Sequence, residues 1–159
     1  MSDTSVLVDL ERGNLVDSCF LLPFEFAVPD LLYSRELEQY GGPDLVKLGL
    51  RVEELTPPEL AAAQGLRAAH PKLSLPDAYA YTLACARRWT LLSGDSELRA
   101  LADAHQVSCF GVLWLCDQLF DGKVIEVAVL IAGLEAIAAH PRCRLPRPEI
   151  SVRLDRYRK

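Results

Sequence analysis

The sequence predicts an α/β fold with a mostly parallel, doubly wound sheet. Short apolar runs alternate with stretches of helical periodicity along the whole chain, as in strands joined by crossover helices. The chain has 159 residues, the usual size of one domain, and can bury a sizeable core. Half of the residues are hydrophobic and a quarter are charged, which is the balance of a globular protein.

The first half of the chain contains clear start and stop signals. Pro29 ends a short apolar strand, and Gly41-Gly42-Pro43 ends the helix that follows it. Apolar and polar residues alternate from Val46 to Leu55, which predicts a half-buried strand toward a sheet edge. Thr56 is an N-cap before two prolines and opens another helix. We therefore expect helices at 15–22, 31–39 and 56–70, and strands at 26–28 and 46–55.

The second half repeats the alternation of strand and helix. Leu75-Pro76-Asp77 opens a helix, and Ser93-Gly94-Asp95 ends an apolar strand that begins at Trp89. We expect helices at 75–88, 96–105, 112–120 and 126–140, and strands at 89–92 and 107–110. The apolar helix at 126–140 could cover the sheet or form a dimer face, and burial within the monomer is the expected role.

Composition limits the class of protein. The longest apolar stretch, Val127 to Ala139, is interrupted by Glu135 and is too short to span a bilayer. The N-terminus has no secretion signal, so the cytoplasm is the expected location. Five cysteines form no Cys-x-x-Cys pair, and none stands at zinc spacing from a histidine, which favours buried thiols over disulfides or structural zinc.

The charge of the chain is unevenly distributed. The net charge of -5 is unfavourable for a general nucleic-acid binder, whose surface should be basic. From Arg142 onward, however, the sequence contains seven Lys and Arg residues and only two acids, Glu149 and Asp155. The basic tail could guide RNA, contact a partner or be a solvated segment.

Acidic residues occur where an open parallel sheet places its binding crevice, beyond the carboxyl ends of the strands. Asp95 follows one predicted strand, and Asp77 begins a helix whose first turn can face the same crevice. Glu36 lies in the helix after the first predicted strand, and Asp3 precedes an apolar run. Converging carboxylates repel one another unless a cation neutralises them, and Mg²⁺ or Mn²⁺ suits oxygen ligands. The alternative is that Asp77 and Asp95 cap helices and that Glu36 lies on the surface.

Four segments carrying these acids resemble the motifs of PIN-domain ribonucleases. Residues 3–10, with the sequence DTSVLVDL, resemble the opening motif, in which an Asp precedes small hydroxyl residues and an apolar run. Val28-Pro29 with Glu36-Leu37 resembles the motif of the second acid, residues 75–78 that of the third, and residues 93–95 that of the fourth. Their order and intervals match, and the resemblance covers residues 3 to 125. It is strongest to prokaryotic toxin-type PIN proteins of the VapC kind.

The resemblance implies a three-layer α/β/α sandwich with a mostly parallel central sheet, and hydrolysis of RNA with Mg²⁺ or Mn²⁺. It also implies an antitoxin protein as partner, since toxin-type relatives are paired in operons with small antitoxins, and a homodimer, since PIN domains often pair. Residues 1–125 would form the catalytic domain. Residues 126–159 would add a C-terminal helix and the basic tail, packed on the same domain.

The resemblance also implies roles for individual residues. Only Met1 and Ser2 precede Asp3, where the family usually has an apolar strand, so Asp9 after the strand-like run Val6–Val8 is an alternative first acid. Glu38 is an alternative second acid. By the resemblance the metal-binding catalytic acids are Asp3, Glu36, Asp77 and Asp95, and Ser5 and Ser93 assist through hydroxyl hydrogen bonds.

Two other functions remain as alternatives. A receiver-like phosphoacceptor domain also gathers acids at the ends of parallel strands, but it needs a Lys after its last strand, where this chain has Gly111-Val112-Leu113. The second alternative is a binding or regulatory protein that keeps the PIN-like fold without catalysis. An RNA cleavage assay with and without metal separates these alternatives from a nuclease.

Overall fold

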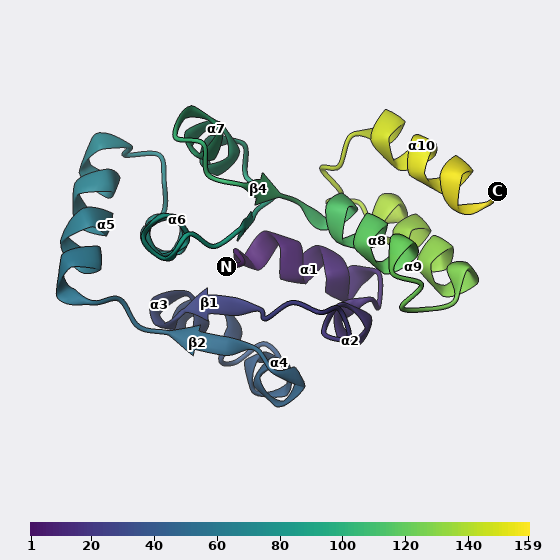
Figure 1. Cartoon of the computed structure of the whole chain (residues 1–159), viewed down its shortest axis with the longest axis horizontal. Helices are drawn as coiled ribbons and strands as arrows, with labels where there is room; N and C mark the ends of the chain where they lie inside the picture. The colour runs from purple at the N-terminus through teal and green to yellow at the C-terminus, as the bar shows by residue number, and fades with distance from the viewer. The chain divides into compact units, whose positions relative to one another are not determined.

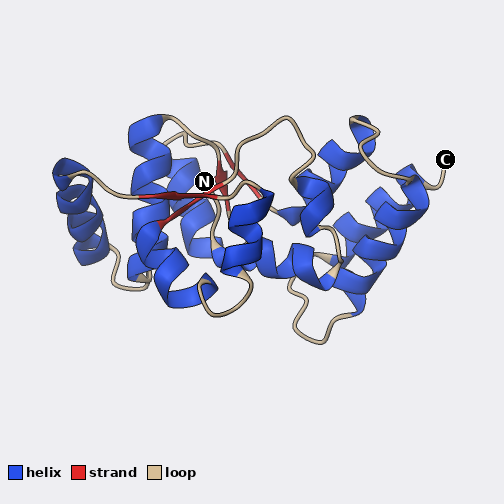
Figure 2. Cartoon of the chain, turned by 90° about the horizontal axis from the view of Figure 1, so that it is seen from below, coloured by secondary structure: helices blue, strands red, loops and turns tan.

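The computed structural model describes all 159 residues and contains helices and short parallel strands (Figure 1). The chain forms two compact units. Residues 1–6 and 25–110 form the first, which we call the sheet unit, and residues 7–24 and 111–159 form the second, which we call the helical unit. All strands belong to the sheet unit, and the remaining residues of both units form helices and loops (Figure 2). None of the helices has the length and apolar character needed to cross a membrane.

The helices and strands follow one another with short connections. In the sheet unit they are β1 (Ala27–Pro29), α3 (Asp30–Leu32), the π-helical segment η1 (Tyr33–Leu37), α4 (Gly42–Leu48), β2 (Arg51–Glu53), α5 (Pro57–Ala69), α6 (Leu75–Arg87), β3 (Leu91–Leu92), α7 (Ser96–Ala104) and β4 (Cys109–Phe110). Helix α1 (Thr4–Arg12) begins in the sheet unit and continues in the helical unit, which also contains α2 (Val16–Cys19), α8 (Val112–Asp121), α9 (Val127–Ala139) and α10 (Arg147–Tyr157).

The strands form two parallel pairs, and the first residues of the chain join these pairs. Strand β1 pairs with β2, and β3 pairs with β4, in both cases parallel. Between the pairs, Ser2 forms a parallel bridge with Leu92, and its N–H donates to the carbonyl of Ala27 at 2.8 Å. The segment before Asp3 therefore occupies the middle of the sheet. The predicted α/β class with parallel strands is confirmed.

Helix α6 is the centre of the core of the sheet unit. Its residues Ala80, Leu83 and Ala84 are almost fully buried, and α5 packs against it at a steep angle (Figure 1). Small alanine side chains allow this close packing on more than one side of the helix. The first turn of α6 is thereby fixed in place, and that turn carries Asp77.

The strand predicted from Val46 to Leu55 is largely wrong. Residues 42–48 form helix α4, and only Arg51–Glu53 are extended. Pro43 in the first turn favours helix, and Gly49, with φ of 114°, ends it in the left-handed conformation that favours glycine. These two local signals outweigh the apolar alternation. The predicted edge position is right, because β2 pairs only with β1.

Two segments near the chain ends are helical where the sequence indicated no helix. The strand-like run Val6–Val8 lies in helix α1, because the Asp3 carboxylate accepts the N–H of Val6 and caps that helix. Much of the basic tail is also a helix, α10, in which Ile150 and Tyr157 are buried. The remaining predicted helices are present within a few residues of their expected bounds. The strand predicted at 26–28 is shifted by one residue, and those predicted at 89–92 and 107–110 are shorter than expected.

The helical unit is built on close packing around α9. Leu130, Leu134 and Ile137 of this helix are fully buried. Gly133 lies against the backbone at Gly13, where an added Cβ would come within 2.8 Å of the Gly13 carbonyl oxygen. One side of the apolar helix predicted at 126–140 is thus buried inside this unit, while its role in a dimer stays a prediction.

Candidate metal-binding site

Asp3 lies at the carboxyl end of the segment that joins the strand pairs. Its N–H donates to the Leu92 carbonyl at 2.9 Å, and its side chain is buried. One carboxylate oxygen, Oδ1, accepts from Ser5 Oγ at 2.7 Å and from the Val6 N–H at 3.1 Å. The other oxygen, Oδ2, accepts from the hydroxyl of Ser93. All of these donors are neutral, so no positive side chain balances this buried carboxylate.

The surroundings of Asp3 disfavour its negative charge. Burial raises the pKa of Asp3 above its usual value of 3.8, and the hydrogen bonds from Ser93, Ser5 and Val6 oppose this increase. The negative charge of Asp77 raises the pKa of Asp3 further. Asp3 and Asp77 are therefore within electrostatic reach of each other. A cation bound between them would offset both the burial and the repulsion.

Ser93 connects two of the predicted acids. It follows β3, it is fully buried, and its N–H donates to the Phe110 carbonyl at 2.8 Å. Its hydroxyl donates to Asp3 and accepts the N–H of Asp95 at 3.0 Å. Ser93 therefore fixes the turn that carries Asp95 relative to Asp3.

The same turn also contacts Ser5. The N–H of Gly94 donates to Ser5 Oγ at 3.1 Å. A Cβ on residue 94 would lie 3.1 Å from that oxygen, so a side chain would crowd this contact. Glycine thus lets the backbone of the turn approach the hydroxyl that also donates to Asp3.

Asp95 has a capping role in the structure. It is exposed, and its Oδ1 accepts the N–H of Leu98 at 2.9 Å, which caps helix α7. Capping uses the carboxylate as an acceptor in the first helical turn, where negative charge is also favourable. The capping alternative for Asp95 is therefore observed, and it does not exclude a second interaction of the same carboxylate.

Asp77 lies in the first turn of α6 and is half-buried. Ser74 caps this helix by accepting the N–H of Asp77 at 3.1 Å, and its hydroxyl donates to Asp77 Oδ2 at 2.6 Å. The serine therefore holds the Asp77 carboxylate in one orientation. Asp77 itself is not the N-cap residue, which was one of its two predicted roles.

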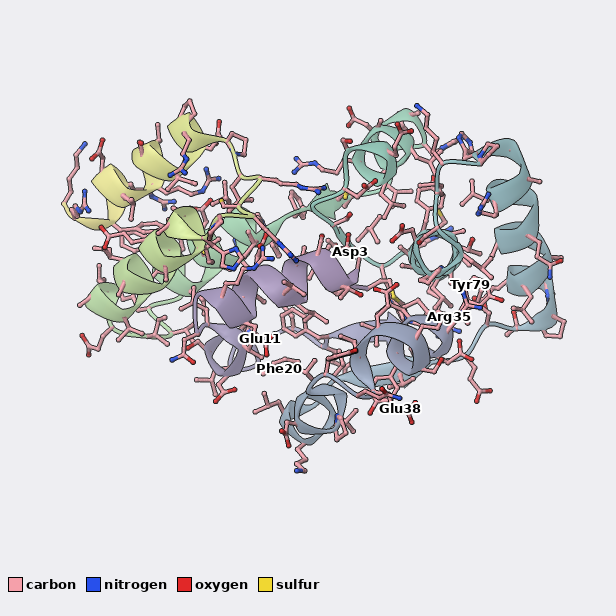
Figure 3. The ribbon with its side chains drawn as sticks, turned by 180° about the vertical axis from the view of Figure 1, so that it is seen from behind. Asp3, Glu11, Phe20, Arg35, Glu38 and Tyr79 are labelled. Atoms are coloured by element: carbon pink, nitrogen blue, oxygen red, sulfur yellow. The ribbon has the colours of Figure 1, made fainter.

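Glu36 comes from a different element, the π-helical segment η1, and its Oε2 accepts the hydroxyl of Thr4. Thr4 follows Asp3 directly, so the second predicted acid is hydrogen-bonded to the residue next to the first. Of the alternative acids, Glu38 is exposed and lies away from Asp3 (Figure 3). Asp9 is in the helical unit, where it forms an ion pair with Arg12 at 2.8 Å.

Three of the predicted acids, Asp3, Glu36 and Asp95, are connected by a framework of hydrogen bonds in the sheet unit. Asp3 and Asp77 interact electrostatically, Ser93 links Asp3 to Asp95, and Thr4 links Glu36 to the same segment. No group of three or more His, Cys, Asp or Glu side chains has the spacing to hold a metal ion by itself. An oxygen-only pair nevertheless fits Mg²⁺, which is usually bound by one or two carboxylates together with waters and substrate phosphate.

Two contributors to this framework were not among the predicted site residues. Thr4 lies inside the opening motif, and its position in sequence gives no sign that it binds Glu36, 32 residues away. Ser74 could have been found, because Ser-x-x-Asp before an apolar run is a capping signature. Cys109 also lies near the site, since burial raises its pKa to about 11 and the charge of Asp3 contributes in the same direction.

The sheet unit is an α/β domain with parallel strands, and acidic residues follow the carboxyl ends of two of its strand segments. A protein-family model described as a PIN domain matches residues 1–158. The chain belongs to the PIN-domain family, as the motif resemblance predicted. Proteins of this family are generally nucleases and typically use divalent metals. Comparison with the curated proteins and with the solved structures found no match.

Proposed function

We propose that the protein is a Mg²⁺- or Mn²⁺-dependent endoribonuclease that hydrolyses RNA through Asp3, Glu36, Asp77 and Asp95. The observation that carries this proposal is the state of Asp3. It is a buried carboxylate held only by neutral donors, with a second carboxylate, Asp77, within electrostatic reach. Such an arrangement is unfavourable alone and is stabilised by a bound cation.

Within this proposal each side chain has a distinct part. Asp3 and Asp77 would hold the ion, because their charges already interact. Asp95 and Glu36 would interact with the ion indirectly, through its bound waters or through the substrate phosphate. Ser5 and Ser93 orient the Asp3 carboxylate, one on each oxygen. Once bound, a divalent metal supplies activation of water and stabilisation of the leaving oxygen of a phosphodiester.

The resemblance to toxin-type PIN proteins supports a narrower proposal. The protein would act as the toxin of a toxin–antitoxin pair in the cytoplasm, with RNA as substrate and a small antitoxin as partner. Pairing into a homodimer and the division into a catalytic part (1–125) and a C-terminal part (126–159) belong to the same proposal. Co-expression with the gene product of a neighbouring small open reading frame, followed by co-purification, tests the antitoxin partner.

A cleavage assay tests the proposed activity. Purified protein is incubated with a labelled single-stranded RNA in EDTA, Mg²⁺ or Mn²⁺, and the products are resolved on a gel. We expect cleavage only with metal, and its loss in Asp3→Asn and Asp77→Asn. Asp44→Asn is the matched control, because Asp44 is an exposed acid paired with Lys47 on α4. Metal-independent cleavage, or full activity of both site variants, would overturn the proposal.

A binding protein without catalysis is the second candidate function. It is favoured by the hydrogen bonds that already engage the acids, since Asp95 caps α7, Asp77 is held by Ser74 and Glu36 accepts from Thr4. In that case the protein would bind RNA and leave it intact with every metal tested. The same gel, combined with a binding assay, distinguishes the two candidates.

A further inference from the structure

The arginines of the helical unit fall into two groups. The first group is neutralised within the unit by ion pairs. Arg153 contacts Asp117 at 2.9 Å, and Arg158 contacts Glu135 at 2.6 Å. All members of this group are paired with acids of the same unit: Arg12, Arg153, Arg156 and Arg158.

The second group is Arg142, Arg144 and Arg147, which we call the arginine cluster. The three side chains occur within six residues, all are exposed, and no ion pair joins any of them to an acid. The nearest acid in sequence, Glu149, is already paired with Arg153 at 2.8 Å. The cluster is therefore a concentrated positive charge that the protein itself does not neutralise.

The position of Arg147 adds to this charge. It is the first residue of α10, and the N-terminus of a helix carries a partial positive charge, so a cation there is unfavourable. Basic residues are favoured near the C-terminus of a helix, and Arg156 lies in the last turn of α10. Stability of α10 therefore does not explain an arginine at this position, where a negative charge would be favoured.

The backbone that carries the cluster is restrained before any ligand binds. Prolines 141, 146 and 148 limit its conformations. The N–H of Cys143 donates to the His140 carbonyl at 2.9 Å, and that of Arg142 donates to His140 Nδ1 at 3.2 Å. A restrained backbone lowers the entropy lost when the arginines bind a partner.

We propose that the arginine cluster binds the phosphate backbone of single-stranded RNA, an inference that rests on RNA being the substrate proposed above. The guanidinium group matches phosphate by paired hydrogen bonds, and all three cations are arginines. A chain of net charge -5 repels RNA overall, so a local positive surface has to provide the attraction. Phosphate contacts of this kind hold the strand without selecting its sequence.

The test measures RNA binding without cleavage. The triple variant Arg142→Gln, Arg144→Gln, Arg147→Gln and the wild type are titrated with a fluorescent single-stranded RNA in EDTA over a range of salt concentrations. Each phosphate contact to a single strand contributes about -0.7 to the slope of log K against log salt, so we expect the slope to fall in magnitude by about 2. Affinity should weaken similarly for different RNA sequences.

A charge-matched control separates this surface from net charge. Arg51→Gln, Arg67→Gln, Arg158→Gln also changes the net charge from -5 to -8, with arginines outside the cluster. We expect this control to keep most of the wild-type slope and affinity. An equal loss in both triple variants would overturn the inference. A triple Arg→Lys variant of the cluster retains the charge and should keep the slope, which guards against a folding defect.

Two outcomes separate this inference from the proposed activity. RNA binding that depends on the cluster, without cleavage in Mn²⁺, would support the surface and reject the ribonuclease. Cleavage in Mn²⁺ together with RNA binding that does not depend on the cluster would support the ribonuclease and reject the surface. Polyglutamate serves as a competitor, and equally tight, cluster-dependent binding of polyglutamate would overturn RNA as the partner in favour of an acidic protein.

Discussion

The sheet unit and the helical unit manage acidic residues in different ways. The sheet unit has 13 Asp and Glu against eight Lys and Arg, whereas the helical unit has nine of each. In the helical unit Asp117 is neutralised by Arg153 and Arg156, with Tyr157 donating a further hydrogen bond. In the sheet unit Asp3 is surrounded by neutral hydroxyls instead. Asp117 is thus neutralised within the protein, whereas Asp3 has no positive partner. Other acids of the sheet unit are paired, as Glu59 is with Arg87.

We expect acids paired with arginines to stabilise the fold, and acids without a positive partner to serve the proposed metal site. Acids that serve structure are paired with arginines inside the protein, and such pairs leave no charge for an added cation. Acids that serve a metal site must remain uncompensated, so they reduce stability until the ion binds. Three substitutions of acids test this contrast, and Gly133→Ala tests the packing that stabilises the helical unit.

Asp95→Asn should reduce RNA cleavage by about a hundredfold or more, because a metal contributes several kcal/mol to such reactions and each 1.36 kcal/mol is a factor of ten. The fold should be retained, since Asn caps helix α7 as well as Asp does. Single-turnover cleavage and thermal melting, each with and without Mn²⁺, provide the measurement. Wild-type cleavage together with a wild-type metal shift would leave Asp95 as a cap alone.

Gly133→Ala should destabilise the helical unit by about 1–3 kcal/mol, the usual cost of overpacking. The added methyl group would lie 2.8 Å from the Gly13 carbonyl oxygen and 2.8 Å from Leu15 Cγ, so backbone has to move. Urea unfolding followed by circular dichroism measures the loss. Gly65→Ala, where nothing lies within 4 Å of the new atom, is the control and should be neutral or slightly stabilising.

Asp3→Asn should change how stability depends on pH in the absence of metal. Because the pKa of Asp3 is raised in the folded protein, its contribution to stability is greatest below 3.8 and is lost as the pH rises through the folded value. The free energy of unfolding of the wild type should therefore fall relative to the variant on going from acid to neutral pH. Urea titrations in EDTA from pH 4 to 8 measure this difference. With Mn²⁺ in place of EDTA, the wild type should instead gain stability relative to the variant as the pH rises.

A wild type that gains stability relative to Asp3→Asn with rising pH in EDTA would contradict this account. It would mean that the carboxylate is compensated within the protein, as Asp117 is in the helical unit. The comparison between the units would then lose its basis.

Glu59→Gln should have the smallest effect, about 1 kcal/mol, because ion pairs close to the surface contribute little. The hydrogen bond from Arg87 lowers the pKa of Glu59 from 4.5 to about 2, with help from the Thr56 N–H. Its contribution is present above pH 4.5 and disappears as the pH falls toward 2. Urea unfolding of both proteins at pH 7 and pH 2 measures it, and a difference that persists at pH 2 would contradict the assignment.

Part of the fold could be predicted from sequence because its causes are local. The capping box of Thr56 and Glu59 joins residues three positions apart, and so does the cap formed by Asp95 on Leu98. Helices with such signals were predicted close to their observed bounds. The motif pattern also identified the PIN family, since the order and spacing of the acids are properties of the sequence alone.

The remaining features depend on contacts that no local pattern contains. Asp3 and Ser93 are 90 residues apart, and only the assembled sheet brings their side chains together. The role of residues 1–3 between the strand pairs, the link from Thr4 to Glu36, and the folding of the basic tail into α10 all required the tertiary structure. By itself the sequence determined the family, the parallel α/β class and which acids are candidates. The tertiary structure decided which of those acids pair with an arginine and which are held only by neutral donors, because such contacts depend on neighbours in space and not along the chain.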